Sequence, residues 1–177
     1  DNIIQNIRVR LGYAYNGDAG GMGLMGNNNI IDHCSISWTT DEGLSSRNAT
    51  NITFQRSLIS ESLNRANHPN YPNGTSEHGF AASIGGKVGS FHHNLLAHNY
   101  GRNWSLAGGL DPNNFFAGNL DITNNVVYNW GSRTTDGGAK EVNFVGNYYK
   151  PGPGMQLQQY ALTMDHENNF AGMQRAY

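Results

Sequence analysis

Short segments in which apolar and polar residues alternate recur along the chain, and each is followed by Asn, Gly, Ser or Thr. Six variants of one motif are present: IIQNIRV at 3–9, IIDHCSI at 30–36, ITFQRSLIS at 52–60, SFHHNLLAHN at 90–99, DITNNVVYNW at 121–130 and VNFVGNYYKPG at 142–152. Alternation over a few residues that ends in a turn is typical of a β-strand. The pattern predicts many short strands, with no helix of convincing length between them.

The repeats align on one polar or small position, occupied by Asn6, Cys34, Ser57, Asn94, Asn125 and Asn147. Their mean spacing of about 28 residues lies within the roughly 20–50 residues of solenoid repeats. We therefore expect an all-β fold, a right-handed single-stranded parallel β-helix of about six coils stacked about 4.8 Å apart. The last three asparagines would form a ladder of hydrogen-bonded amides. A β-sandwich is the alternative, although its strands usually recur every ~8–12 residues.

We expect residues 1–177 to form a single β-helix domain. Within it, 61–80 has two of the 5 Pro residues and no strand pattern, which predicts an inserted loop. A solenoid needs caps at its ends, yet the first strand motif begins almost at the first residue. The sequence therefore favours a partial solenoid, an internal fragment of a longer protein whose other segments would be its partners.

Composition narrows the class of protein. The chain has 177 residues, 23 Gly and about 25 Asn, and only 14% charged residues. It contains no apolar run of the ~18 residues that a membrane helix needs, and its 9 Tyr, 7 Phe and 3 Trp argue against disorder. The net charge of −2 gives no general basic field, so we expect neither a nucleic acid nor a membrane as partner. The single cysteine, Cys34, is interpreted as a buried apolar residue.

Charged residues recur seven to eight positions after the aligned position. They are Asp41 and Glu42, then Arg65 after Asn64, Arg102 after Gly101 and Arg133 after Ser132. In stacked coils such a column would line one side of the solenoid, where arginines on neighbouring coils could hold a polyanion. Asp32 adds a carboxylate to the coil of Asp41 and Glu42, and hard oxygen ligands of this kind suit Ca²⁺. We therefore predict a Ca²⁺ site at Asp32, Asp41 and Glu42.

Other chemistries are less well supported. His33, His92, His93 and His98 do not have the spacing of a complete zinc site, and strand alternation puts them on different faces, so we interpret them as structural. No GxSxG nucleophile motif occurs.

Several of these segments are similar to those of a known family. IIDHCSISWTTDEGLSS, NITFQRSLISESLN, HGFAASIGG, SFHHNLLAHNYGRN, LDITNNVVYNWG and NYYKPGP resemble pectate lyase family one, the right-handed β-helix lyases, in order over roughly residues 1–153. The resemblance implies β-elimination of galacturonate-type polysaccharide in which calcium binds the uronate carboxylate. Asp32 and Asp41 match calcium-binding positions, and Arg102 matches the catalytic base. Because a guanidinium is almost always protonated in proteins, the alternative role for Arg102 is electrostatic stabilisation.

The chain also departs from the family pattern. Ser45 stands where a second calcium carboxylate is expected, with Glu42 as the substitute, and Ala107 replaces a second arginine. A lysine before IGG is missing, and His78 is the polar group available for substrate contact. Asn103 and Trp104 replace a proline-containing stretch, and we expect both to bind substrate, Trp104 by stacking on a sugar.

The leading hypothesis is a secreted or periplasmic, calcium-assisted lyase that acts on an acidic, plant-type polysaccharide such as pectate. Arg65, Arg133 and His78, with Asn103 and Trp104, would bind the polymer. A non-catalytic uronate-binding β-helix is an alternative. A β-helical glycoside hydrolase is another, although it requires opposed carboxylates.

Overall fold

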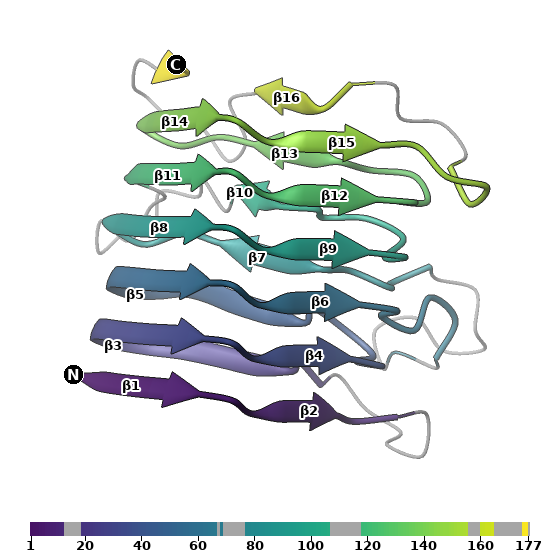
Figure 1. The fold of residues 1–177 in the computed structure, drawn as a ribbon, viewed down its shortest axis with the longest axis horizontal. Coiled ribbons are helices and arrows are strands. Elements are labelled where there is room, and N and C mark those ends of the chain that lie inside the picture. The colour runs from purple at the N-terminus through teal and green to yellow at the C-terminus, as the bar shows by residue number, and fades with distance from the viewer. Residues whose placement is uncertain are drawn as a thin grey trace.

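The computed structural model describes residues 1–12, 19–66, 68, 77–106, 118–155, 160–164 and 175–176, and Figure 1 shows their arrangement. Within these ranges the only regular elements are β-strands, and every strand pairing is parallel. We find no helix in the described part of the chain with the length and apolar character needed to cross a membrane.

The strands belong to two sheets. Sheet A contains β1 (Asn2–Gln5), β3 (Met22–Asp32), β5 (Leu44–Gln55), β7 (Ala82–Ile84), β8 (Val88–His92), β10 (Ser105–Leu106), β11 (Asn119–Thr123), β13 (Thr135–Gly137), β14 (Glu141–Val145), β16 (Leu162–Met164) and β17 (Arg175–Ala176). Sheet B contains β2 (Arg8–Arg10), β4 (Ser35–Ser37), β6 (Leu58–Ser60), β9 (Leu95–Ala97), β12 (Val126–Tyr128) and β15 (Tyr148–Lys150).

Sheet A has two arms, which are joined through the long strand β5. The first residues of β5 pair with β7, and the pairing continues through β10, β13 and β16, which we call the first arm. Its last residues pair with β8, and the pairing continues through β11 and β14, the second arm. The chain therefore repeats one path, from first arm to second arm to sheet B, and each strand pairs with its counterpart in the next repeat (Figure 1). The predicted all-β fold of repeated parallel strands is confirmed.

The interior is filled by columns of apolar side chains. In sheet B, Ile36, Ile59, Leu96 and Val127 are register neighbours, and all are buried. The corresponding buried column of the second arm is Ile31, Phe54, Phe91 and Ile122. Because alternate residues of a strand point to opposite faces, the apolar and polar alternation in the sequence produces these columns directly.

The predicted asparagine ladder is confirmed. Asn94 Nδ2 donates to Asn125 Oδ1 at 3.0 Å, and Asn125 Nδ2 donates to Asn147 Oδ1 at 3.0 Å. The column continues toward the N-terminus with Ser57, whose backbone N–H donates to Asn94 Oδ1, and Cys34, whose N–H donates to the Ser57 hydroxyl. Cys34 is buried, as expected. From Cys34 to Asn147 the ladder satisfies buried polar groups at the turns between the second arm and sheet B.

The expectation for Asn6 is wrong by one residue. Arg8 pairs with Ser35, which places Ile7 and not Asn6 level with Cys34. Asn6 has a φ of 58° and corresponds to His33, which has a φ of 52°. Asparagine tolerates this left-handed conformation better than most residues do, so the sequence signal at Asn6 is that of a turn and not that of the ladder.

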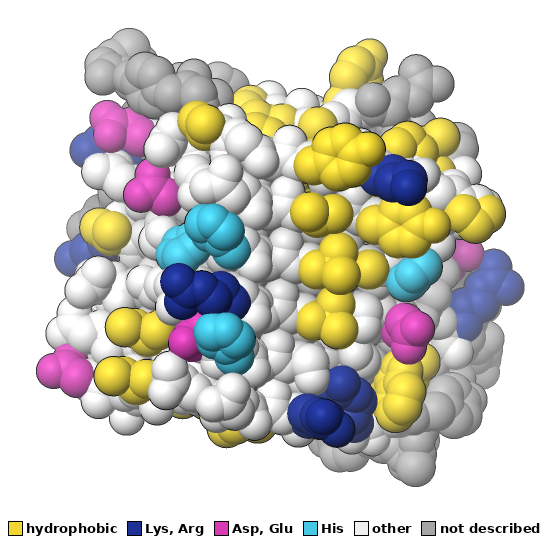
Figure 2. Space-filling view, in the orientation of Figure 1, with side chains coloured by type: hydrophobic (Ala, Val, Ile, Leu, Met, Phe, Trp, Pro, Cys, Tyr) yellow, Lys and Arg dark blue, Asp and Glu magenta, His cyan; other side chains and the backbone are white. Residues whose placement is uncertain are grey.

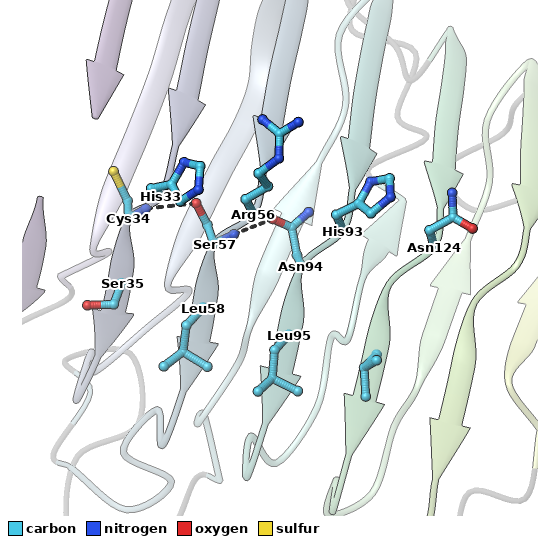
Figure 3. Close-up of a pocket in the computed structure, with 11 residues that line it drawn as sticks. His33, Cys34, Ser35, Arg56, Ser57, Leu58, His93, Asn94, Leu95 and Asn124 are labelled. Carbon is cyan, nitrogen blue, oxygen red and sulfur yellow. Dashed lines mark hydrogen bonds between the residues drawn. The ribbon is translucent and has the colours of Figure 1, made fainter. Parts of the chain in front are cut away.

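The residue before the ladder position has positive φ in each following coil, as at Arg56, His93 and Asn124. These side chains lie along one side of an open groove whose other side includes Leu58 and Leu95, and the ladder residues lie between them (Figure 3). On the same face, a band of apolar side chains crosses the strands of sheet B from one coil to the next (Figure 2).

Candidate functional site

Charged side chains converge where the strands of the first arm begin. Backbone hydrogen bonds join the segments 41–43, 79–81, 101–103 and 132–134, in that order. Because parallel strands in register bring equivalent positions together, Glu42, Arg102 and Arg133 lie on coils of the same stack. The column predicted from the sequence exists at these positions.

Arg65 does not occupy the column. The coil after Glu42 contributes Phe80, because the N–H of Gly43 donates to the Phe80 carbonyl and Phe80 forms a bridge with Gly101. Arg65 instead pairs with Glu77 at 2.9 Å, with 70% of its side chain exposed. The predicted place of Arg65 in the column is therefore wrong, because Phe80 occupies it. Contact of Arg65 with substrate stays a prediction.

Glu42 is the centre of an ion-pair cluster, and its side chain is only 9% exposed. Its Oε1 atom accepts hydrogen bonds from Arg102 Nη1, from Arg47 Nη2 at 3.1 Å and from the Ser83 hydroxyl at 2.6 Å. Burial alone would raise the pKa of Glu42, but side-chain hydrogen bonding with Asp41 and Ser83 and the charges of the two arginines hold it below its ordinary value. Glu42 is therefore ionised, and its Oε1 atom is shared by the three donors.

Two guanidinium groups lie near the ring of Phe80. The guanidinium carbon of Arg102 is 4.1 Å from the centre of the Phe80 ring, and that of Arg133 is 5.7 Å from it. Arg133 also forms a bidentate ion pair with Asp136, at 2.6 and 2.9 Å. The ring face favours cations at both positions, and it keeps the two arginines on one surface.

Asp41 lies against two histidines. His78 Nε2 is 3.0 Å from Asp41 Oδ1, and His68 Nε2 is 3.9 Å from Asp41 Oδ2. The two imidazole rings are 4.3 Å apart between centroids, and the His78 ring also lies 4.3 Å from that of Phe80. All three side chains are at least four-fifths buried. His78 therefore belongs to the cluster, as an imidazole paired with a carboxylate.

Backbone contacts fix the segments that carry these groups. The Thr39 hydroxyl donates to the Asp41 carbonyl at 2.9 Å, and the His78 N–H donates to the Asn64 carbonyl at 2.9 Å. Gly79 follows His78 where two segments pass closely, and a Cβ there would lie 2.6 Å from the Ser62 carbonyl oxygen. Only glycine fits at this close approach. Gly79 therefore lets the two segments pass side by side and so fixes the position of the neighbouring His78.

Asp32 does not join the cluster. It ends β3, where the second arm meets sheet B, and it accepts a hydrogen bond from Gln5 Nε2 at 2.9 Å. His33 lies 2.8 Å and Arg56 3.6 Å from its carboxylate. Burial opposes ionisation, but hydrogen bonds from His33, Gln5 and Gln55 lower the pKa of Asp32 to about 2. Strand β4 of sheet B lies between Asp32 and Asp41 in the sequence. The two carboxylates therefore belong to one coil but lie at opposite ends of that strand.

Asn103 and Trp104 do not face a ligand. Trp104 has no exposed surface, and its ring lies 6.1 Å from that of Phe54 and 5.5 Å from that of Phe91. Asn103 is 1% exposed, and its Nδ2 donates to the Arg133 carbonyl at 2.9 Å. Both predictions of substrate contact are wrong, because the chain turns inward after Arg102 and adds these side chains to the core.

The donor set does not fit Ca²⁺ well. Of the three predicted carboxylates, Asp32 lies elsewhere, Glu42 is occupied by two arginines, and Asp41 faces two imidazole nitrogens. Calcium takes six to eight oxygen ligands. Ca²⁺ binding at these three residues therefore stays a prediction that the described geometry does not favour.

Some residues of the cluster had no signal in the sequence analysis. Arg47, His68, Phe80 and Ser83 were not predicted there. Ser83 could have been found from the register, since it pairs with Ser45 on one side and Ser105 on the other. His68 could not, because nothing periodic places the inserted segment 61–80 against Asp41.

The open groove of Figure 3 is a second concave surface, between the second arm and sheet B. It is lined by His33, Arg56 and His93 on one side and by apolar residues on the other (Figure 3). His33 and Arg56 of this groove lie against one carboxylate, that of Asp32, whereas the first arm brings together two carboxylates, two imidazoles and two guanidinium groups. We therefore place the candidate active site at the first arm.

Comparison with known proteins adds to this geometry. No family model matches the chain. The chain is 33% identical over 184 residues to an Aspergillus flavus protein, 34% identical over 179 residues to one from Aspergillus terreus, and 37% identical over 174 residues to one from Emericella nidulans. All three are named "Probable pectate lyase C". The sequence is similar to those of named pectate lyases.

These alignments cover 100%, 96% and 95% of this chain, but only 38%, 37% and 35% of the respective relatives. The chain thus spans less than two-fifths of the length of the relatives that it matches. The similarity supports a pectate lyase-like family.

Proposed function

We propose that this chain is the part of a right-handed, single-stranded parallel β-helix lyase that carries the reaction centre, and that it cleaves an acidic, galacturonate-type polysaccharide by β-elimination. The observation that carries the proposal is the cluster of Arg102, Glu42 and Arg47 at the start of the first arm. The repeated path of the chain through two arms and a second sheet supports the β-helix. The similarity to proteins named as pectate lyases supports the reaction class.

The charge distribution suits an anionic polymer despite the net charge of −2. Arg102 and Arg133 lie on neighbouring coils, and both contact Phe80. Guanidinium groups recognise carboxylates through paired hydrogen bonds. Each uronate unit carries one carboxylate, so a row of arginines can hold successive units.

The chemistry requires stabilisation of new negative charge. In the elimination, a base removes the proton from the carbon next to the uronate carboxylate, the bond from the neighbouring carbon to the glycosidic oxygen breaks, and a carbon–carbon double bond forms. The leaving oxygen takes up a proton and becomes a new chain end. Because charge develops beside an existing carboxylate, a cation such as Arg102 at that position lowers the barrier.

The ion pair between Arg102 and Glu42 determines what Arg102 can do. Arg102 is held by the Glu42 carboxylate, so a role as proton acceptor requires that this ion pair open when the polymer binds. A charged Arg102 would act by stabilising the enolate. The pH dependence of kcat/KM separates these roles, since a proton acceptor makes the rate rise with pH through its own ionisation.

A uronate-binding protein without catalysis is the second candidate. It is favoured by one observation, the engagement of Arg102 by Glu42. A hydrolase is less well supported, because it needs two carboxylates on opposite sides of the scissile bond, whereas Glu42 is held by two arginines and Asp41 by two histidines.

Incubation of the protein with polygalacturonate distinguishes the three functions. A lyase produces unsaturated uronate ends, measured by their ultraviolet absorbance, in step with new reducing ends. Reducing ends without the absorbance would identify a hydrolase, and binding without either product would identify a binding protein. A parallel reaction with a Ca²⁺-selective chelator tests the predicted calcium dependence. Since polymers of this class lie outside the cell, we also propose that the protein is secreted or periplasmic.

A further inference from the structure

Asp41, His68 and His78 form a group of metal-ligating side chains that the proposed function leaves unused. One donor atom from each of the three lies within 4.8 Å of the other two. His68 is 4% exposed, His78 13% and Asp41 16%. Among the described residues, these are the three His, Cys, Asp or Glu side chains whose ligand atoms lie close enough together to share one metal ion.

The separations are close to those of a coordinated ion. Zinc binds imidazole nitrogen and carboxylate oxygen at about 2.0–2.2 Å, so the donors of a tetrahedral site lie roughly 3.3–3.6 Å from one another. His78 Nε2 and Asp41 Oδ1 are 3.0 Å apart, and His68 Nε2 and Asp41 Oδ2 are 3.9 Å apart. These two distances end at different oxygen atoms of the Asp41 carboxylate, and one donor atom from each residue lies within 4.8 Å of the other two. Binding of one shared ion requires the side chains to close these separations.

The chemistry of the donors selects the class of ion. Two imidazoles and one carboxylate suit Zn²⁺ and other divalent transition metal ions, whereas Ca²⁺ prefers oxygen ligands throughout. We propose that Asp41, His68 and His78 bind one divalent transition metal ion of the Zn²⁺ class. Three protein ligands leave a coordination position for water or a ligand carboxylate.

The site is held by the fold. Asp41 is positioned by the Thr39 hydroxyl, and His78 by the backbone bond to Asn64 and the close approach at Gly79. His78 and Arg102 both contact the Phe80 ring, so an ion held here would lie beside the Glu42 cluster. The inference rests on the donor geometry and does not depend on lyase activity.

Zinc titration in the absence of polysaccharide tests the proposal. The purified, metal-free protein competes with a chromophoric chelator for Zn²⁺, and we expect one tightly bound ion per chain that excess Ca²⁺ does not displace. Co²⁺ bound at the same site should show visible absorption bands of a four- or five-coordinate ion. Asp41→Asn, His68→Gln and His78→Gln should each weaken Zn²⁺ binding by more than about tenfold, since even outer partners of a metal site contribute 10–100-fold.

His92→Gln is the matched control. His92 and His93 also contact each other, with their Nδ1 atoms 2.9 Å apart, but they do not belong to the group of three donors. This variant should bind Zn²⁺ as the parent does. Circular dichroism tests whether each variant is folded. Where a variant does not fold, the Co²⁺ spectrum of the parent protein tests the site instead. An absence of chelator competition, binding lost equally in His92→Gln, or displacement by excess Ca²⁺ would each overturn the proposal. A protein that binds Zn²⁺ but forms no unsaturated product would contradict only the proposed function.

Discussion

Replacing Asn125 with alanine should destabilise the protein strongly, because this side chain joins three consecutive coils. Its Nδ2 atom donates to the Phe91 carbonyl at 2.8 Å and to Asn147 Oδ1 at 3.0 Å. Its Oδ1 atom accepts from both the backbone N–H and the side-chain amide of Asn94, each at 3.0 Å. Asn125 is 1% exposed, so its side-chain amide depends on these protein partners rather than on solvent.

The expected loss in the free energy of unfolding is about 3–5 kcal/mol. A buried hydrogen bond contributes about 1 kcal/mol net, and each buried group left without a partner costs about 1–3 kcal/mol. Four bonds are removed, while a water molecule in the vacated space would restore part of the loss. Such a loss is a large fraction of the roughly 5–15 kcal/mol that stabilises a typical domain.

Urea unfolding followed by circular dichroism measures this loss. The matched control is Asn143→Ala, because Asn143 is an exposed asparagine whose side chain donates one hydrogen bond, to Asp121 at 3.1 Å. We expect the control to change the free energy of unfolding by less than about 0.5 kcal/mol. If Asn125→Ala and the control lie within about 1 kcal/mol of each other at equal m-values, the ladder does not have the energetic role assigned to it.

Three further predictions concern single side chains. The pKa of Asp32 is about 2 in the folded protein, against an ordinary value of 3.8, so its contribution to stability is present above the higher value and is lost as pH falls toward the lower one. Asp32→Asn should therefore flatten the fall in stability over that interval, and an unchanged acid limb in urea unfolding would contradict the assignment. Trp104→Phe should lower the free energy of unfolding by less than the ~3–5 kcal/mol that complete truncation of a core aromatic costs. It should leave oligogalacturonate affinity unchanged in calorimetry, whereas weaker binding by the folded variant would return Trp104 to the ligand surface. Glu42→Gln should release Arg102 and tighten oligogalacturonate binding about fivefold, the effect of a charge interaction of about 1 kcal/mol; weaker binding would show that Glu42 itself contacts the ligand.

The repeated architecture could be predicted because its causes are local and periodic. Strand alternation sets the inward columns, such as Ile36, Ile59 and Leu96, and the ladder follows from asparagine at one position of successive repeats. The same periodicity placed Arg102 in one column with Glu42, where the two side chains form an ion pair. Pairing in parallel register converts equal offsets in sequence into contacts in space.

The errors arise where the period is interrupted. The inserted segment 61–80 delays the return of the chain, so Phe80 takes the level assigned to Arg65, and His68 reaches Asp41 without any periodic signal. Trp104 follows Arg102 by two residues, but it points into the core because the chain bends between them. Neither the length of an excursion nor the direction of a bend follows from alternation of apolar and polar residues.

The most direct test of the central claim compares the parent protein with Arg102→Ala on polygalacturonate. Binding is measured by calorimetry, and elimination by the ultraviolet absorbance of unsaturated uronate ends. Our account predicts that the parent forms this product and that the folded variant still binds the polymer while its rate of product formation falls by at least about a hundredfold, the scale seen when one group that stabilises a developing oxyanion is removed. Product formation by Arg102→Ala at the parental rate would contradict it.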